Sequence, residues 1–242
     1  MFFQTRLFHI QVCGSVHVWD DSPVSVSQET VQAYQRAQRV VFEADYRAPV
    51  DLQIGSYQNG DRLSQVIPSS LFADVLSSFK KFGLPTDSVD SLKPWMAALY
   101  LMPHQFRSVG ITNSHGIDKH IFDQAVADRK TIDCFETMSG QLNFFEGAPI
   151  EEQETFLRRM LSLAAADEAV RVFSAYKARD MGALEVLATD ALKIMPKMFE
   201  QMIPGRNTSW KRTILEKFND GIPTLIVVGA LHCVGPTAVQ IV

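Results

Sequence analysis

The sequence predicts an α/β protein with a mostly parallel sheet that is flanked by helices. Apolar runs of strand length end close to His17, Glu43, Glu136 and Gly229. A stretch with helical spacing separates the first two runs, and another precedes the third. A strand, a helix and a strand within about 35 residues form a βαβ unit, whose crossover makes the two strands parallel.

Strand patterning occurs in five segments. The first alternates apolar and polar residues and becomes continuously apolar around Gly14. The third is short, and we expect it at the edge of a sheet. The last is the most strand-like run of the chain and follows the Gly-Ile-Pro turn at 221–223. In chain order, the predicted strands are 7–18, 40–43, 62–67, 130–136 and 224–228.

Helical periodicity accounts for most of the remaining chain. Ser27 is a good first residue for the helix after the first strand, and three glutamates favour a helix start at Glu151. In chain order, the predicted helices are 27–38, 69–102 with breaks at 83–85 and 93–94, 116–126, 151–166, 170–178, 182–192 and 210–219. The stretches 69–114 and 140–204 hold more helix than the sheet needs. We therefore expect one domain over 1–242, with a helical cap from these stretches over the sheet edge.

Composition excludes two classes of protein. The 242 residues are 46% hydrophobic and 21% charged, which is enough apolar material for one sizeable core or a core with an inserted cap. The net charge is -4 and no basic block of five or more residues occurs, which argues against a nucleic-acid partner. No apolar run approaches the ~20 residues that cross a bilayer.

The expected compartment follows from the first residues and the cysteines. The segment from Met1 lacks the apolar core and cleavage site of a signal peptide, so we expect a cytoplasmic protein, or a secreted or periplasmic one if a leader has been removed. The three cysteines are Cys13, Cys134 and Cys233, in or beside apolar runs, which is typical of buried free thiols. The absence of C-x-x-C excludes a zinc ribbon.

Two G-x-x-H segments, at 14–17 and 229–232, follow strand-like runs at opposite ends of the chain. Glu43 and Glu136 each close another such run. If these strands are parallel, their carboxyl ends share one edge, and two imidazoles with up to two carboxylates meet there. Neutral imidazole and carboxylate oxygen are usual ligands of catalytic divalent metals. The sequence therefore predicts a metal-competent site at this edge.

Each of these residues also has a purely structural interpretation. A histidine at a strand end can be satisfied by a backbone hydrogen bond, and Glu43 can lie at an exposed strand end. The remaining histidines, His9, His104, His115 and His120, are interpreted as surface or core residues. Ser15 and Ser114 lack the G-x-S-x-G context, so a serine-hydrolase elbow is not supported.

A set of short segments resembles one protein family. The segments are Gly14-Ser15-Val16-His17, Phe42-Glu43-Ala44-Asp45, Leu92-Lys93-Pro94-Trp95, Gly116-Ile117-Asp118, Phe135-Glu136-Thr137, Arg206-Asn207 with Trp210, and Gly229-Ala230-Leu231-His232 with Gly235. In order and character they resemble the TraB/GumN family, which includes the Tiki metalloproteases and is related in fold to the erythromycin-esterase and ChaN-like proteins. The resemblance extends over nearly the whole chain.

The resemblance implies a hydrolase that depends on a divalent metal such as manganese, cobalt or zinc. His17 and His232 match the paired G-x-x-H histidines of the family. Glu43 and Glu136 match its two glutamates, and Arg206 matches its arginine. Arg206 would then stabilise developing negative charge, or else act as a structural ion-pair partner, for example of Glu136.

The leading hypothesis is a metal-dependent hydrolase of a peptide bond. His17, Glu43 and His232 would hold the ion, which activates water, and Glu43 or Glu136 would act as general base beside Arg206. A second hypothesis is a metal-independent esterase-like hydrolase in which His17 and Glu43 activate water directly. A third is a non-catalytic protein that binds a peptide or small signal. The expected partner is a peptide or small-molecule substrate, and the sequence predicts no oligomeric state.

Overall fold

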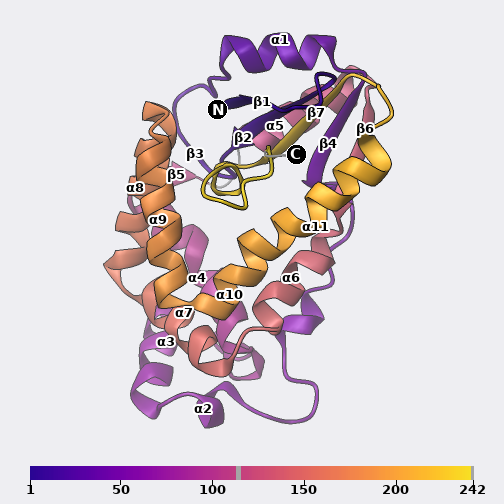
Figure 1. Cartoon of the computed structure of the whole chain (residues 1–242). Helices are drawn as coiled ribbons and strands as arrows, with labels where there is room; N and C mark the ends of the chain where they lie inside the picture. The colour runs from indigo at the N-terminus through magenta and orange to yellow at the C-terminus, as the bar shows by residue number, and fades with distance from the viewer. Residues whose placement is uncertain (113–115, 241–242) are drawn as a thin grey trace.

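The protein is described by a computed structural model that covers residues 1–112 and 116–240. The sequence-based statements on Ser114 and His115 lie outside these described residues. The main sheet has five strands in the order β1-β2-β7-β4-β6 (Figure 1). Their bounds are β1 Phe2–Gln4, β2 Ile10–Ser15, β7 Thr224–Gly229, β4 Arg39–Ala44 and β6 Thr131–Glu136. All neighbouring pairs are parallel except β1 with β2, which confirms the predicted α/β fold with a mostly parallel sheet.

The register of the sheet brings the functional segments to one edge. Strand β7 lies between β2 and β4, with Ser15 opposite Gly229 and Phe42 opposite Val227. On the far side of β4, Ala44 is opposite Glu136 of β6. The carboxyl ends of four parallel strands therefore lie side by side, although Ser15 and Gly229 are more than two hundred positions apart in the chain. A separate two-stranded sheet pairs β3 (Trp19–Asp20) with β5 (Ile111–Thr112).

Alternate strand residues face two different layers of helices. Side chains at odd and even positions of a strand lie on different faces of the sheet, because successive side chains point in opposite directions. One face packs Val40, Phe42, Leu225 and Val227 against helices α1 (Gln28–Arg36) and α5 (Ile117–Ala127). The other packs Val41, Ile226 and Val228 against Trp210, Ile214 and Phe218 of the last helical segment. Both faces of β4 and β7 are thus buried, which explains their continuous apolar sequences.

Further helices form a lobe beyond the carboxyl edge of the sheet (Figure 1). In chain order, the helices of the lobe and of the sheet faces are α1 Gln28–Arg36, α2 Leu63–Val66, α3 Ser69–Lys81, α4 Pro94–Ser108, α5 Ile117–Ala127, α6 Met138–Glu146, α7 Ile150–Leu161, α8 Leu163–Ala178, α9 Met181–Ile194, α10 Pro196–Glu200 and α11 Arg206–Thr213. Short 3₁₀ turns occur at Leu52–Gly55, Val89–Ser91 and Ala230–Cys233, and π-helical turns at Gln201–Gly205 and Ile214–Phe218. Helices α2, α3, α4 and α7 share a hydrophobic core separate from the two cores of the sheet. The domain and cap boundaries predicted from the sequence stay a prediction.

Three local predictions need correction. The segment 62–67, predicted as a short edge strand, contains helix α2 instead. Leu63 and Ile67 are both buried in the lobe core, and residues four apart share a helix face as readily as alternate residues share a strand face. The single helix predicted over 151–166 ends at Leu161, and α8 begins after Ser162. Strand β1, which the sequence did not predict, hydrogen-bonds to β2 in antiparallel orientation.

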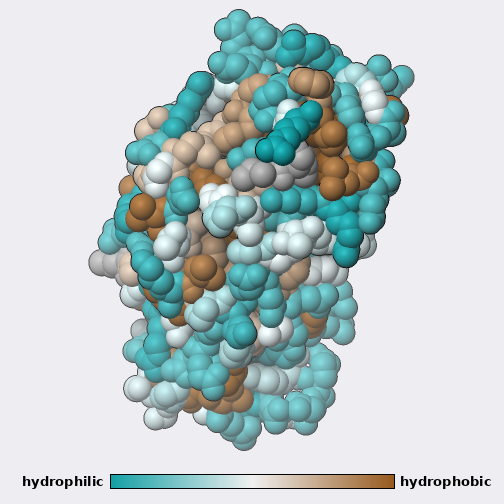
Figure 2. Space-filling view, in the orientation of Figure 1, coloured by the Kyte–Doolittle hydropathy of each residue, from teal (hydrophilic) through white to brown (hydrophobic). Residues whose placement is uncertain are grey.

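The outer surface carries scattered apolar side chains. On the face shown in Figure 2, hydrophobic residues form small patches separated by hydrophilic ones. In the part of the chain that the structure describes, no helix combines the length and the apolar character that a bilayer crossing requires.

Candidate functional site at the carboxyl edge of the sheet

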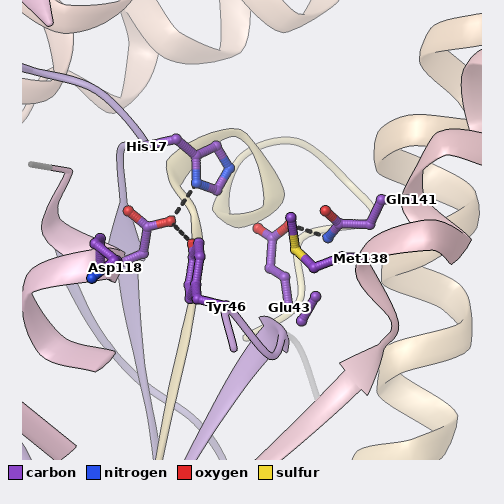
Figure 3. Close-up of a pocket in the computed structure, with 8 residues that line it drawn as sticks. His17, Glu43, Tyr46, Asp118, Met138 and Gln141 are labelled. Atoms are coloured by element: carbon purple, nitrogen blue, oxygen red, sulfur yellow. Dashed lines mark hydrogen bonds and ion pairs between the residues drawn. The ribbon is translucent and has the colours of Figure 1, made fainter. Parts of the chain in front are cut away.

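A cavity of about 410 Å³ lies where β4, α5 and α6 meet (Figure 3). Its lining residues are His17, Glu43, Ala44, Tyr46, Asp118, Lys119, Met138 and Gln141. The strand ends supply the histidine and the glutamate, and the first turns of the two helices supply most of the rest. A cavity at the carboxyl ends of parallel strands is where open α/β sheets commonly bind ligands.

His17 lies two residues beyond β2 and is fixed by the start of α5. The Ile117 N–H donates to the Val16 carbonyl over 3.0 Å. A Cβ on Gly116 would lie 2.4 Å from the His17 carbonyl carbon, so only glycine permits this close approach of the two backbones. The approach places Asp118, in the first turn of α5, beside the His17 ring.

The His17 imidazole is paired with a buried carboxylate. Its Nδ1 contacts Asp118 Oδ2, and the Tyr46 hydroxyl donates to the same oxygen (Figure 3). The Asp118 side chain is 5% exposed, whereas that of His17 is 58% exposed. The Asp118 carboxylate raises the pKa of His17 to about 9. Among the described residues, the second Asp118 oxygen has no hydrogen-bond partner. The carboxylate therefore directs its interactions to His17 and Tyr46.

Glu43 is a buried carboxylate with several donors around it. Its Oε1 accepts from the Gly229 N–H over 2.7 Å, and its Oε2 accepts from Arg206 Nη2 over 2.6 Å. The Gln141 side-chain amide approaches Oε2 to 3.3 Å. Burial alone would raise the pKa of Glu43, but His232, the Arg206 guanidinium, His17 and the Gly229 N–H lower it to about 2. Glu43 is therefore an anion throughout the neutral range.

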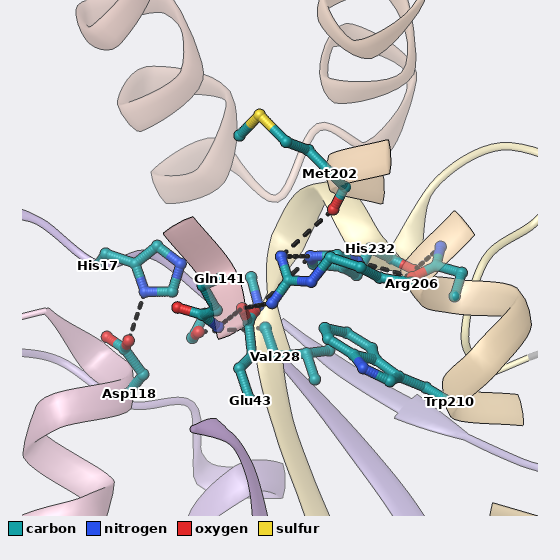
Figure 4. Close-up of polar contacts among 12 residues, drawn as sticks. His17, Glu43, Asp118, Gln141, Met202, Arg206, Trp210, Val228 and His232 are labelled. Carbon is teal, nitrogen blue, oxygen red and sulfur yellow. Dashed lines mark hydrogen bonds and ion pairs between the residues drawn. The ribbon is translucent and has the colours of Figure 1, made fainter. Parts of the chain in front are cut away.

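Arg206 contacts Glu43 and His232 (Figure 4). It also contacts Glu136. Its Nε lies 3.1 and 3.2 Å from the two oxygens of Glu136, and its Nη1 lies 3.2 Å from His232 Nε2. Nη1 also donates to the Met202 carbonyl over 3.2 Å. That carbonyl is accessible because the Arg206 backbone N–H bonds to Ile203 instead of completing an α-helical turn.

Two aromatic rings enclose the Arg206 guanidinium. Its central carbon lies 4.5 Å from the ring centre of Trp210 and 5.1 Å from that of Phe144. Trp210 also donates its Nε1 hydrogen to Glu136 over 2.8 Å. Ion-pair contacts in the plane of the guanidinium and aromatic contacts to its faces fix its position.

His232 is buried, with an exposed side-chain fraction of 3%. Its Nδ1 lies 2.6 Å from the Asn207 side-chain oxygen, and the Asn207 amide donates to the His232 carbonyl over 3.1 Å. Its Nε2 lies 3.7 Å from Glu43 Oε1. Burial lowers the pKa of His232 to about 3, so the ring is neutral at neutral pH. With the Nδ1 hydrogen directed to Asn207, the Nε2 lone pair faces Arg206.

Gly229 forms the floor between the three predicted metal ligands. A Cβ at this position would lie 3.4 Å from Glu43 Oε1, 3.6 Å from His17 Nε2 and 3.6 Å from His232 Cδ2. The missing side chain therefore leaves space of about one methyl group that these residues share. This is the point at which a reacting atom can approach His17 and Glu43 together.

The predicted site residues thus meet, but in two groups. His17 and Glu43 line the cavity, whereas Glu136 binds Arg206 and Trp210 outside the set that lines it. The Arg206–Glu136 ion pair is the structural alternative that the sequence had left open. Residues that sequence reasoning did not assign to the site are Tyr46, Asp118, Gln141 and Asn207.

The predicted ligand atoms are of the types that bind divalent ions, but two of them are already occupied by contacts within the protein. Both histidines direct Nδ1 to an oxygen acceptor, the arrangement that orients metal-ligating imidazoles. However, Glu43 Oε2 and His232 Nε2 are both contacted by the Arg206 guanidinium. Among the described residues, no three histidine, cysteine or acidic side chains are grouped as a metal site. The set therefore does not fit an ion while Arg206 keeps its position.

The fold and the site define an α/β protein with paired G-x-x-H histidines at the carboxyl edge of its sheet. A family model described as the TraB/PrgY/gumN family matches residues 5–241. The chain belongs to the TraB/PrgY/GumN family, as the resemblance predicted. No curated protein and no solved structure matched the chain.

Proposed function

We propose that this protein is a hydrolase that adds water to the carbonyl group of a peptide or an ester, with His17 as the general base. One observation carries the proposal. The exposed His17 imidazole lines the cavity, directs Nδ1 to buried Asp118 and has its Nε2 next to the space that Gly229 leaves open. A base whose orientation is set by a carboxylate, next to space for a reacting atom, is the arrangement that activates water.

In the proposed reaction, His17 carries one proton from the attacking water to the leaving atom. Nε2 of neutral His17 takes a proton from water while the water oxygen bonds to the carbonyl carbon. The tetrahedral intermediate then collapses, the bond to the leaving nitrogen or oxygen breaks, and the proton on Nε2 passes to the leaving atom. Asp118 holds the ring and stabilises its protonated form. The Gln141 amide lines the cavity, and we assign to it the role of stabilising the negative charge that develops on the carbonyl oxygen.

In this proposal, Glu43 and Arg206 set the charge around His17 and do not take part in proton transfer. Glu43 is held ionised by its donors, so it orients water and favours the positive charge that His17 acquires. Each Arg206 nitrogen contacts a protein acceptor, so the guanidinium acts by fixing Glu43 and His232 rather than by binding substrate. Glu136, with Trp210, holds the guanidinium in place.

A second candidate is metal-dependent hydrolysis of the same bond, with His17, Glu43 and His232 as ligands. The observation in its favour is that Asp118 and Asn207 orient the two imidazoles as acceptors orient metal-ligating histidines. The ion would polarise the carbonyl group and acidify its bound water. This candidate requires Arg206 to release both Glu43 and His232.

Turnover of model substrates tests the proposal. Native protein, His17→Ala and the control His120→Gln would be assayed on fluorogenic peptides and nitrophenyl esters. His120 lies on exposed α5 surface, so its loss should leave turnover unchanged. We expect His17→Ala to reduce turnover by about 10²-fold or more. Equal turnover by native protein and His17→Ala would contradict the proposal, and binding of a peptide without cleavage by native protein would favour a non-catalytic binder.

Chelation separates the two candidates. The proposed His17 base keeps its activity after dialysis against EDTA. The metal-dependent candidate loses activity in EDTA and regains it with manganese or cobalt.

A further inference from the structure

Arg206 lies among the side chains that the sequence predicted to hold a divalent ion. Its Nη2 is 2.6 Å from Glu43 Oε2 and 3.1 Å from Glu136 Oε2, and its Nη1 is 3.2 Å from His232 Nε2. Two carboxylates and one imidazole therefore converge on the guanidinium (Figure 4). Carboxylate oxygen and imidazole nitrogen are also the donor types that divalent ions prefer.

We propose that Arg206 is the resident cation of this site and closes it to divalent ions. The guanidinium takes the position between Glu43, Glu136 and His232 that an ion would need. The inference concerns ion binding, so it stands or falls separately from the hydrolysis proposed above.

The ligand atoms that an ion would need are already in contact with Arg206. A neutral imidazole has one acceptor lone pair outside its N–H, and that of His232 meets Arg206 Nη1. While this contact persists, His232 cannot ligate an ion. A metal would also have to compete with Arg206 for Glu43 Oε2, the closest ion-pair oxygen.

The guanidinium is also held by residues other than Glu43 and His232. Its remaining contacts are Glu136, the Met202 carbonyl and the rings of Trp210 and Phe144. Its side chain is 9% exposed, and a guanidinium does not lose its charge in proteins. An ion entering beside Arg206 would meet a fixed like charge instead of a vacant anionic site.

Removal of the guanidinium should therefore create a metal site. In Arg206→Met, the space that Nη1 and Nη2 leave is surrounded by Glu43, Glu136 and His232. Methionine keeps an unbranched apolar side chain between the two aromatic rings without adding a competing cation. Arg206→Lys restores a positive charge near the same place and should leave the site closed.

A buried arginine elsewhere in the sheet provides a matched control. Arg39 is also 9% exposed, and its ion-pair partners in the described part of the chain are two aspartates, Asp220 and Asp133. Arg39→Met thus removes a buried guanidinium between two carboxylates without opening the predicted site.

The experiment is isothermal titration with Co²⁺ of EDTA-treated, dialysed protein, together with the visible absorption of bound Co²⁺. We expect Arg206→Met to bind one Co²⁺ at least tenfold more tightly than native protein, Arg206→Lys or Arg39→Met. A folded Arg206→Met that binds no more tightly than native protein overturns the inference.

If Arg206→Met does not fold, the native protein decides. Native binding of one Co²⁺ at micromolar concentration, abolished by His232→Ala, overturns the inference. Native protein without such a site sustains it. Activity is not measured in this experiment, so failure of the hydrolase proposal and failure of this inference have different readouts.

Discussion

The two G-x-x-H histidines share a sequence pattern but lie in opposite environments. His17 is more than half exposed and pairs with an aspartate, whereas His232 is buried and pairs with an asparagine. The carboxylate raises the pKa of His17 to about 9, and burial lowers that of His232 to about 3. The motif therefore fixes where each imidazole lies, whereas burial and the neighbouring side chain fix its charge: His17 favours its protonated form, and His232 is an uncharged acceptor inside the protein.

Replacing the two partners should give opposite results, with the largest effect on activity at Asp118. Asp118→Asn removes the charge that holds His17 and permits the wrong tautomer, so we expect turnover to fall by about 10³-fold. Asn207→Ala leaves His232 Nδ1 without its partner and removes one of two donors to the His232 carbonyl, so it should lower the free energy of unfolding by about 2 kcal/mol. Turnover assays and urea unfolding of both variants measure these effects. An Asp118→Asn variant with native turnover would remove the distinction between the histidines.

The two motif glycines provide the next comparison. A Cβ on Gly229 meets only ordinary contacts of 3.4–3.6 Å, so Gly229→Ala should fold but fill the space above His17 and Glu43. We expect at least about a tenfold loss of turnover, since a methyl group there displaces the reacting atom. A Cβ on Gly14 instead meets Ala230 and Phe3 at 3.3 Å, so Gly14→Ala should cost about 1 kcal/mol of stability and leave turnover per folded molecule unchanged. Unimpaired turnover in Gly229→Ala would place the reaction elsewhere.

The pKa values predict different pH dependences for activity and stability. His17 must be neutral to act as a base, so turnover should rise with pH and level off near its pKa of about 9. Because the folded-state pKa of His17 lies above its ordinary value of 6.5, its contribution to stability is present below about 6.5 and is lost as pH rises through about 9.

The contribution of Glu43 to stability depends on pH in the opposite direction to that of His17. Its folded-state pKa is lowered from 4.5 to about 2, so its stabilising contribution is present above about 4.5 and is lost as pH falls through about 2. Urea midpoints measured from pH 2 to 9 should show an acid limb in native protein that is smaller in Glu43→Gln. An acid limb of equal size in that variant would assign it to other carboxylates.

The smallest predicted effect concerns Tyr46. Its hydroxyl donates to the Asp118 oxygen that also contacts His17. Tyr46→Phe leaves the His17–Asp118 pair in place and removes one donor, so turnover should fall by about threefold to tenfold, without a matching loss of stability. A loss as large as that of Asp118→Asn would show that the hydroxyl takes part in the reaction itself.

Much of the fold was predictable because burial leaves a clear pattern. Strands β4 and β7 are covered on both faces, so they are continuous apolar runs, and the helix before each places the strands in parallel. Strand β1 has three residues, too few for a periodicity, and its existence depends on pairing with β2. At α2, the buried residues Leu63 and Ile67, the latter just after the end of the helix, were compatible with either periodicity, and packing in the core of the lobe favours the helix.

The candidate site was predictable where it depends on strand ends and not where it depends on loops. His17, Glu43, Glu136 and His232 converge because the register of parallel strands aligns their carboxyl ends. Asp118 reaches His17 only through the close approach at Gly116, a contact that no spacing rule contains. A glycine directly before a helix with an acidic first turn was the available signal. Whether Arg206 binds carboxylates or substrate depended on its helix geometry, which composition does not reveal.

The widened turn at Gln201–Gly205 makes the placement of Arg206 sensitive to chain length. Each residue of an α-helix advances the side-chain direction by about 100°, so a single deletion in this turn would rotate Arg206 by roughly that angle relative to α10. Such a shortened chain would retain every side chain of the site in its order and yet leave Glu43 and Glu136 without their shared counter-charge. Among homologues, the length of this turn is thus as informative as the identity of the arginine that follows it.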